Sequence, residues 1–174
     1  MKLKEKVDFL INKLEEIYPN LDIPLDHKDE YTLLIAVLMS AQATDKKVNE
    51  ITPILFSRAD NPYDMVKMTI DEIRNIIKPV GLSPTKSKGI WNLSKILIKD
   101  HKSKIPSDFN DLTNLPGVGN KTASVYQNEI LDIPRIAVDT HVYRVSNRVG
   151  LAKTKTADQT QEILEQITPK KWLK

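Results

Sequence analysis

Apolar side chains recur along this chain every three or four residues, and turn-forming residues separate the recurrences. In the first stretch the apolar positions are Leu3, Val7, Leu10, Ile11, Leu14, Ile17 and Tyr18. This period is typical of an amphipathic helix, and Pro19 ends it. Residues 31–43 are apolar nearly all round, which predicts a central buried helix.

Capping residues and prolines place the ends of the other predicted helices. Asn61-Pro62 gives a helix start with proline in the first turn, and Thr69 with Glu72 forms a capping box. The pattern predicts helices over approximately residues 44–56, 63–68, 70–77, 83–97, 107–112, 120–131, 140–149 and 156–167. The apolar run at 136–138 is too short to count as a strand. The sequence therefore predicts an all-α fold with short connections.

The composition is ordinary for a globular protein, with 40% hydrophobic and 28% charged residues among 174. Neither a membrane-spanning run of about 18 apolar residues nor a signal peptide is recognisable, so we expect a cytoplasmic protein. The chain has no cysteine, which excludes disulfides and thiolate chemistry. Its histidines form no ligand-spaced pair, and no metal site is predicted; they are His27, His101 and His141.

Positive charge is concentrated in the middle of the chain. Residues 78–121 carry 8 basic and 3 acidic side chains, whereas residues 1–77 carry 10 basic and 14 acidic ones. The basic band consists of Lys78, Lys86, Lys88, Lys95, Lys99, Lys102 and Lys104. Such a band fits the phosphate backbone of a nucleic acid. A solvated lysine face on an exposed helix is the alternative that the charges alone leave open.

The stretch most indicative of chemistry is Leu115-Pro116-Gly117-Val118-Gly119-Asn120-Lys121-Thr122-Ala123, and Asp139 follows eighteen residues after its lysine. The two glycines predict a tight turn, and the helix that starts after it offers the positive end of its dipole to an anion. The same potential disfavours protonation of Lys121, and a neutral amine is a nucleophile. A nearby carboxylate can stabilise a cation or move a proton. This combination indicates chemistry on a nucleic-acid sugar.

Together with residues 138–144, this stretch resembles the helix-hairpin-helix base-excision DNA glycosylases, and specifically the endonuclease III family. Ser40-Ala41-Gln42-Ala43-Thr44-Asp45 resembles the family's minor-groove loop, and Val80-Gly81-Leu82-Ser83 resembles its wedge loop. The order and spacing of these segments match the family, and the likeness covers roughly residues 5–170. The resemblance implies DNA repair by a bifunctional glycosylase/AP lyase that removes oxidised pyrimidines and cleaves the abasic strand by β-elimination.

By this resemblance, Lys121 is the expected nucleophile and Asp139 its catalytic partner. Gln42 would enter the gap left by an extruded nucleotide, and Leu82 would wedge the opposite strand. The residues expected to contact DNA are Ser40, Gln42, Thr44, Asp45, Leu82, Lys86, Lys88, Leu115, Gly117, Val118, Gly119 and His141. The expected partner is double-stranded DNA with damaged bases or abasic sites, bound by a monomer in the bacterial cytoplasm and associated with the nucleoid.

Simpler roles remain open for several of these residues. Asp139 has the chemistry of an N-cap for the helix starting at Thr140, which is compatible with catalysis. Leu82 has the alternative of a buried side chain after a turn glycine, and Gln42 that of a cap on the central helix. His141 has the alternative of ordering the loop without titrating.

Two other functions stay open at this point. Adenine glycosylases of the same superfamily lack the nucleophilic lysine and use a glutamate in the segment matching residues 34–42. This chain has Lys121 and no carboxylate in that segment, which favours the lyase. The more distant alternative is a catalytically impaired helix-hairpin-helix fragment that only binds DNA.

The resemblance also implies a domain division. Residues 22–133 would form a six-helix domain with its helix-hairpin-helix near 108–131, and residues 1–21 with 134–174 would form an incomplete second helical domain. Relatives continue past the position of Lys174 into four cysteines that hold a 4Fe-4S cluster, for which this chain encodes no cysteine. We therefore expect an exposed apolar patch around Trp172 and Leu173, and weak hydrogen-exchange protection over residues 155–174.

Overall fold

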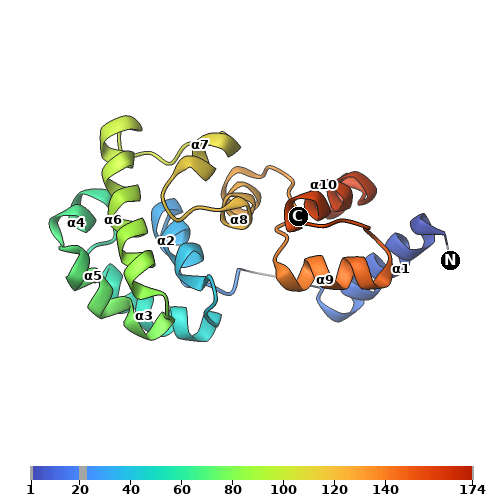
Figure 1. The fold of residues 1–174 in the computed structure, drawn as a ribbon, viewed down its shortest axis with the longest axis horizontal. Helices are drawn as coiled ribbons and strands as arrows, with labels where there is room; N and C mark the ends of the chain where they lie inside the picture. The colour runs from blue at the N-terminus through green and yellow to red at the C-terminus, as the bar shows by residue number, and fades with distance from the viewer. Residues whose placement is uncertain (1, 20–22, 174) are drawn as a thin grey trace. The chain divides into compact units, whose positions relative to one another are not determined.

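The computed structural model describes residues 2–19 and 23–173 (Figure 1). Within these residues the regular structure consists of ten α-helices and two 3-10 helices, and no strand is present. The predicted all-α fold is confirmed. The chain divides into two compact units, Ile23–Tyr126 and Met1–Asp22 with Gln127–Lys174. None of the described helices is long and apolar enough to cross a membrane.

Helix α2 (Glu30–Ser40) is the core of the unit Ile23–Tyr126. Every residue from Tyr31 to Met39 is buried, as expected for a helix that is apolar on all sides. Its start is fixed by Asp29, whose carboxylate accepts a hydrogen bond from the Thr32 amide at 2.8 Å. The prediction of a central buried helix is confirmed, but its predicted end at Ala43 is wrong, because the helix stops at Ser40.

The other helices of this unit begin at the capping residues that the sequence indicated. Thr44, Asn61 and Thr69 cap α3 (Asp45–Phe56), α4 (Pro62–Lys67) and α5 (Ile70–Ile77). The short 3-10 helix η1 (Lys78–Val80) follows, and then the long helix α6 (Ser83–Asp100). Helix α6 packs against α2, α4 and α5, so that it connects the buried core to the surface helices (Figure 1).

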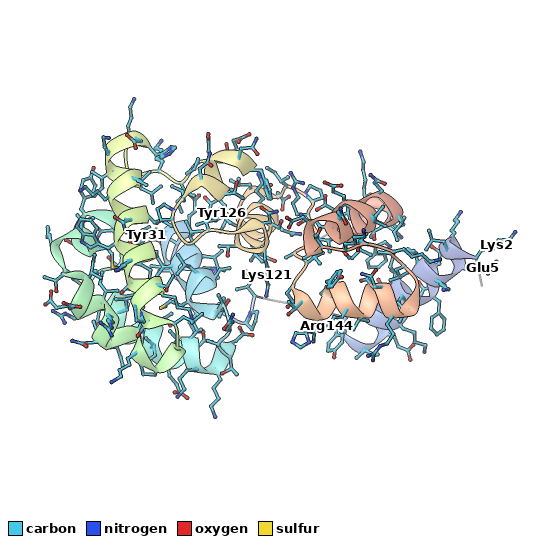
Figure 2. All side chains as sticks on the ribbon, viewed as in Figure 1. Lys2, Glu5, Tyr31, Lys121, Tyr126 and Arg144 are labelled. Atoms are coloured by element: carbon cyan, nitrogen blue, oxygen red, sulfur yellow. The ribbon has the colours of Figure 1, made fainter. Side chains whose placement is uncertain are left out.

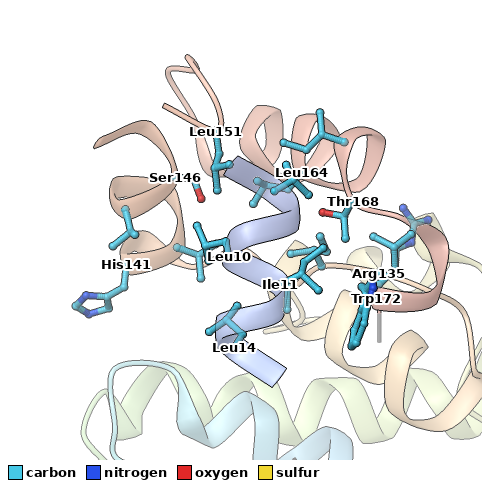
Figure 3. A pocket seen from close by; sticks show the side chains of 17 residues that line it. Leu10, Ile11, Leu14, Arg135, His141, Ser146, Leu151, Leu164, Thr168 and Trp172 are labelled. Carbon is cyan, nitrogen blue, oxygen red and sulfur yellow. The ribbon is translucent and has the colours of Figure 1, made fainter. Parts of the chain in front are cut away.

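The second unit contains α1 (Leu3–Ile17), α9 (Thr140–Val149), α10 (Ala157–Ile167) and the 3-10 helix η2 (Lys170–Trp172). Val7, at 6% exposed, is the one buried residue of helix α1. Its apolar stripe lines a pocket of about 620 Å³, together with residues of α9 and α10. Figure 3 shows Leu10, Ile11 and Leu14 of α1 at this pocket, with His141 of α9 and Trp172 around it.

The end of the described chain differs from the sequence expectation. Leu173 is only 8% exposed, and its carbonyl accepts a hydrogen bond from the Asn128 amide group at 2.8 Å. Trp172 is half-buried and lines the pocket. The expectation that both side chains lie uncovered is therefore wrong for Leu173. The large exposed apolar side chains of this unit lie on α1, beside it and on α9: Leu3, Phe9, Leu14, Ile17, Tyr18, Val145 and Val149.

Candidate nucleic-acid interface and active site

The glycine-containing turn joins α7 (Phe109–Asn114) to α8 (Asn120–Leu131). Asp108 caps α7 by accepting the amides of Asn110 and Asp111 at 2.8 and 3.1 Å. The turn closes through the Val118 amide, which donates to the Leu115 carbonyl at 3.0 Å. The Leu115 and Val118 side chains are buried, and the Leu115 amide likewise donates within the protein, to the Leu112 carbonyl at 3.1 Å.

Gly117 lets this turn approach the core closely, and Gly89 lies opposite it. Gly117 has a φ of 83°, and a Cβ there would lie 2.8 Å from Cδ1 of Leu38 in α2. Gly89 lies in α6, where a Cβ would stand 3.6 Å from the Gly117 Cα. Glycine in a helix interior is less stable than alanine by about 1 kcal/mol. At 3.6 Å such a Cβ would be in ordinary van der Waals contact, so the packing of the turn against α6 does not by itself require glycine at position 89.

Lys121 is exposed in the first turn of α8, two residues after Gly119 (Figure 2). The first turn of a helix carries the positive end of its dipole, which favours a bound anion. No acidic residue stands in that turn. Lys121 therefore lies at the helix start that the sequence predicted, and its role as a nucleophile stays a prediction.

Asp139 is the N-cap of α9. One of its carboxylate oxygens accepts the amides of His141 and Val142, both at 2.9 Å, and the residue is half-exposed. The N-cap interpretation is confirmed, and a catalytic role remains compatible with it. Asp139 belongs to the unit Met1–Asp22 with Gln127–Lys174, whereas Lys121 belongs to the unit Ile23–Tyr126.

The predicted minor-groove loop begins where α2 ends. The Ser40 hydroxyl donates to the Val37 carbonyl at 2.9 Å, and the Thr44 hydroxyl accepts the Lys47 amide at the start of α3. Between these two ends, Gln42 is exposed and has a φ of 56°. Asp45 is exposed at the first position of α3.

The predicted wedge, Leu82, is the N-cap residue of α6 and has a φ of 48°. Its side chain is 50% exposed, so the alternative of a buried core residue is wrong. Gln42 and Leu82 are thus both non-glycine residues in the left-handed region, which costs of order 1–3 kcal/mol for a residue held in such a conformation. Outliers of this kind cluster at functional sites.

Lys86 differs from the sequence expectation. It is 5% exposed, and its Nζ donates to the carbonyls of Met39 and Val80 at 2.8 and 2.9 Å. Burial lowers the pKa of this amine. The prediction that Lys86 contributes to an exposed basic band is therefore wrong, because its ammonium group bonds to backbone inside the protein. Lys88, two residues later, is exposed.

His141 is exposed in the first turn of α9 and lies at the edge of the apolar pocket (Figure 3). No group of three metal-binding side chains gathers within residues 2–19 and 23–173. Iron–sulfur clusters are held by cysteine thiolates, and the sequence contains no cysteine. The residues of this chain therefore do not fit such a cluster, and no step of the chemistry below uses one.

Two structural residues escaped the sequence analysis. Gly89 stands in a predicted helix without any turn signal, and the structure places it against Gly117 of the hairpin turn. Lys86 bridges the Met39 and Val80 carbonyls, and in sequence nothing but its position distinguishes it from the other lysines of the basic band. The one available signal was its position: in a helix starting at Ser83, Lys86 falls on the same face as Ile90 and Leu93, which are buried.

Comparison with known proteins relates the chain to DNA repair enzymes. The model of the family described as HhH-GPD superfamily base excision DNA repair protein matches residues 35–170. Endonuclease III of Rickettsia conorii is 44% identical over 168 residues, which cover 94% of this chain and 80% of that protein. Endonuclease III of Escherichia coli K12 is 39% identical over 160 residues, covering 92% and 76%.

Solved structures agree with these relatives. A non-covalent Endonuclease III–DNA complex matches with a TM-score of 0.92 and 35% identity, covering 98% of this chain and 80% of that one. A trapped Endonuclease III–DNA covalent intermediate matches with a TM-score of 0.94 and 35% identity, covering 99% and 82%.

Proposed function

This chain belongs to the HhH-GPD superfamily of base excision DNA repair proteins, and from that premise we propose that it is a bifunctional DNA glycosylase and AP lyase. Its substrate is double-stranded DNA carrying an oxidised pyrimidine or an abasic site, and it acts as a monomer. The relatives that share its sequence are named Endonuclease III, and one solved relative was trapped as a covalent intermediate with DNA. The expected compartment is the bacterial cytoplasm.

The observation that carries this proposal is the exposed amine of Lys121 directly after the turn that contains Gly117 and Gly119. A covalent intermediate with a sugar needs a nucleophile that substrate can reach. A lysine amine is a suitable nucleophile, because it forms a Schiff base with the carbonyl of an opened sugar. The dipole of α8 and the amides of the turn provide the adjacent place for a phosphate.

The chemistry follows from that amine. The Lys121 Nζ attacks C1′ of the sugar, the bond from C1′ to the base breaks, and the base leaves after taking up a proton. Ring opening converts the adduct to a protonated Schiff base. Loss of the 2′ proton then expels the 3′ phosphate by β-elimination, and water releases Lys121. Asp139 stabilises the positive charge that develops on the sugar and assists the proton transfers.

The loops of the unit Ile23–Tyr126 give access to the base. A base inside a duplex must be extruded, which costs a few kcal/mol of unstacking. Gln42 fills the vacated place and Leu82 wedges the opposite strand, and both side chains are exposed on turns. The surrounding contacts with DNA come from Ser40, Thr44, Asp45, Lys88 and His141, and from the backbone of Leu115, Gly117, Val118 and Gly119.

An adenine-specific sibling is less well supported. The segment from Leu34 to Gln42, which carries a glutamate in those relatives, contains no carboxylate here. Residues Leu34–Met39 are buried and apolar, so the segment offers no acid at the surface. In relatives, the resemblance implies, four cysteines hold a 4Fe-4S cluster. This sequence contains no cysteine, and the proposed chemistry assigns no step to such a cluster.

Covalent trapping tests the proposal. The protein is incubated with a duplex that contains thymine glycol or an abasic site, and borohydride is added to reduce any Schiff base. We expect a cross-linked species with the wild type and none with Lys121→Gln. That variant should keep DNA binding within about tenfold, because one charge contributes little beside the other phosphate contacts.

Lys67→Gln is the matched control, since Lys67 is an exposed lysine of α4 outside the basic segment. It should be trapped as well as the wild type. Equal trapping of Lys121→Gln would refute the assignment of the nucleophile, and absence of trapping and of strand cleavage in the wild type would refute the proposed activity.

A further inference from the structure

Lys86 joins the two loops that are proposed to enter DNA. Its Nζ donates to the Met39 carbonyl at 2.8 Å and to the Val80 carbonyl at 2.9 Å. Met39 directly precedes Ser40, where the loop that carries Gln42 begins. Val80 ends η1 and directly precedes Gly81-Leu82. A single buried ammonium group therefore holds the starting point of each loop.

Both carbonyls lie at helix ends, where backbone acceptors have lost their partners. In a continuing helix the Met39 carbonyl would accept the Ala43 amide, but that amide bonds to Ser40 instead, at 3.0 Å. A cation at the C-terminus of α2 is also favoured by the helix dipole. Lys86 therefore donates to two carbonyls, those of Met39 and Val80, that lie where a helix ends and the chain turns.

Each loop carries its inserted residue in a conformation that needs support. Gln42 has a φ of 56° and Leu82 a φ of 48°, and neither is glycine. Such residues keep a left-handed backbone only where the surrounding structure holds it. On the basis of the proposed function, we propose that Lys86 is a positioning residue, which sets the separation of Gln42 and Leu82 so that both enter the duplex at one damaged site.

This role has a consequence that a phosphate contact would not have. Extrusion of a nucleotide requires opening the base stack of a duplex, whereas a single strand has no opposite strand to wedge. A displaced pair of loops should therefore slow cleavage of an abasic site in a duplex and spare cleavage of the same site in a single strand. A buried ammonium group also releases no counterions from DNA.

The experiment compares Lys86→Met with the wild type and with Lys67→Met, measuring kcat/KM for cleavage of an abasic duplex and an abasic single strand. For Lys86→Met we expect about a tenfold loss or more on the duplex, the scale of a misplaced positioning group, and less than about a twofold change on the single strand. Lys67→Met should change neither rate. The salt dependence of duplex binding should keep its slope in Lys86→Met and lose about one unit in Lys88→Met.

Folding of Lys86→Met is checked by circular dichroism. If this variant does not fold, Lys86→Arg replaces it in the same cleavage assay. The bulkier guanidinium cannot occupy the position of the amine, so we expect about a threefold fall in the ratio of duplex to single-strand cleavage. A wild-type ratio in a folded Lys86→Met, or in Lys86→Arg as its substitute, would overturn the inference. A reduced salt slope in Lys86→Met would overturn it as well, in favour of a phosphate contact. A wild-type protein that cleaves neither substrate would instead contradict the proposed function, and this inference with it.

Discussion

Helix α2 is apolar on all sides, whereas helix α1 is amphipathic, and the two helices pack differently. All residues of α2 from Tyr31 to Met39 are buried, and this helix is the core of the unit Ile23–Tyr126. In α1, which belongs to the other unit, only Val7 is buried, and Phe9 and Ile17 are 58% and 60% exposed. An amphipathic helix with one apolar stripe therefore contributes less to a core than a helix that is apolar on all sides.

The same contrast separates the proposed functional residues. Gln42, Leu82 and Lys121 all belong to the unit built around α2, and Lys86 bonds to the end of α2 itself. Asp139 belongs to the unit of α1, where apolar side chains line an open pocket. We infer that the nucleophile and the inserted side chains stand on the better-packed part of the chain, because precise placement needs a rigid scaffold.

The largest difference is expected from the same substitution made in the two helices. Leu34→Ala removes a side chain with no exposed surface and should lower the free energy of unfolding by about 2–5 kcal/mol. Leu14→Ala removes a side chain that is 49% exposed and should cost less than about 1 kcal/mol. Urea unfolding curves measure both values. Equal losses would show that α1 is as much a core helix as α2.

Asp139→Asn should lower base excision by roughly 10²-fold, the scale of losing one preorganised electrostatic group, with little effect on folding because asparagine is also a good N-cap. The matched control is Asp108→Asn, since Asp108 caps α7 through the same pair of following amides. Single-turnover excision and thermal melting are measured for both variants. Unchanged excision by Asp139→Asn would reduce this carboxylate to a structural cap.

A smaller effect is expected at the wedge. Leu82→Ala should slow excision from a duplex by about tenfold, because the side chain that fills the opened stack is lost. Ile54 of α3 is 52% exposed, against 50% for Leu82, so Ile54→Ala removes a similar apolar surface away from the loops. It should change excision by less than about twofold. The wedge role fails if both variants retain the wild-type rate.

The smallest effects concern local opening within the wild-type protein. Amide hydrogen exchange should be slow over Tyr31–Met39, where every residue is buried, and over α8, where Ala123, Ser124, Tyr126 and Gln127 are buried. It should be faster over residues 155–173, where α10 has three buried side chains. Indistinguishable protection in these regions would contradict the difference in packing inferred above.

Helix positions followed from local signals that the sequence displays. Asn61-Pro62 and the pair Thr69 and Glu72 mark helix starts through bonds to neighbouring amides, and the structure contains those bonds. The end of α2 carried no such signal, because Ala41-Gln42-Ala43 is compatible with a helix and the reversal occurs at Gln42. The end of α2 is bonded to Lys86, whose acceptors Met39 and Val80 lie 47 and 6 residues away in sequence.

Site residues were predictable to the extent that their chemistry is local. The turn around Gly117 and the cap at Asp139 are properties of short segments, and their geometry was anticipated. The buried state of Lys86, the fit of Gly89 against Gly117 and the covered position of Leu173 depend on chain segments distant in sequence. Hydrophobic periodicity contains no information about such partners.

The central claim is that Lys121 bonds to the sugar, and mapping the reduced cross-link tests it most directly. The wild-type protein is trapped on an abasic duplex with borohydride, the DNA is digested, and tryptic peptides are analysed by mass spectrometry. A modified Lys121 blocks cleavage there, so we predict the adduct in a single peptide from Ile105 to Arg135. An adduct on another amine, with normal cleavage after Lys121, would contradict the account.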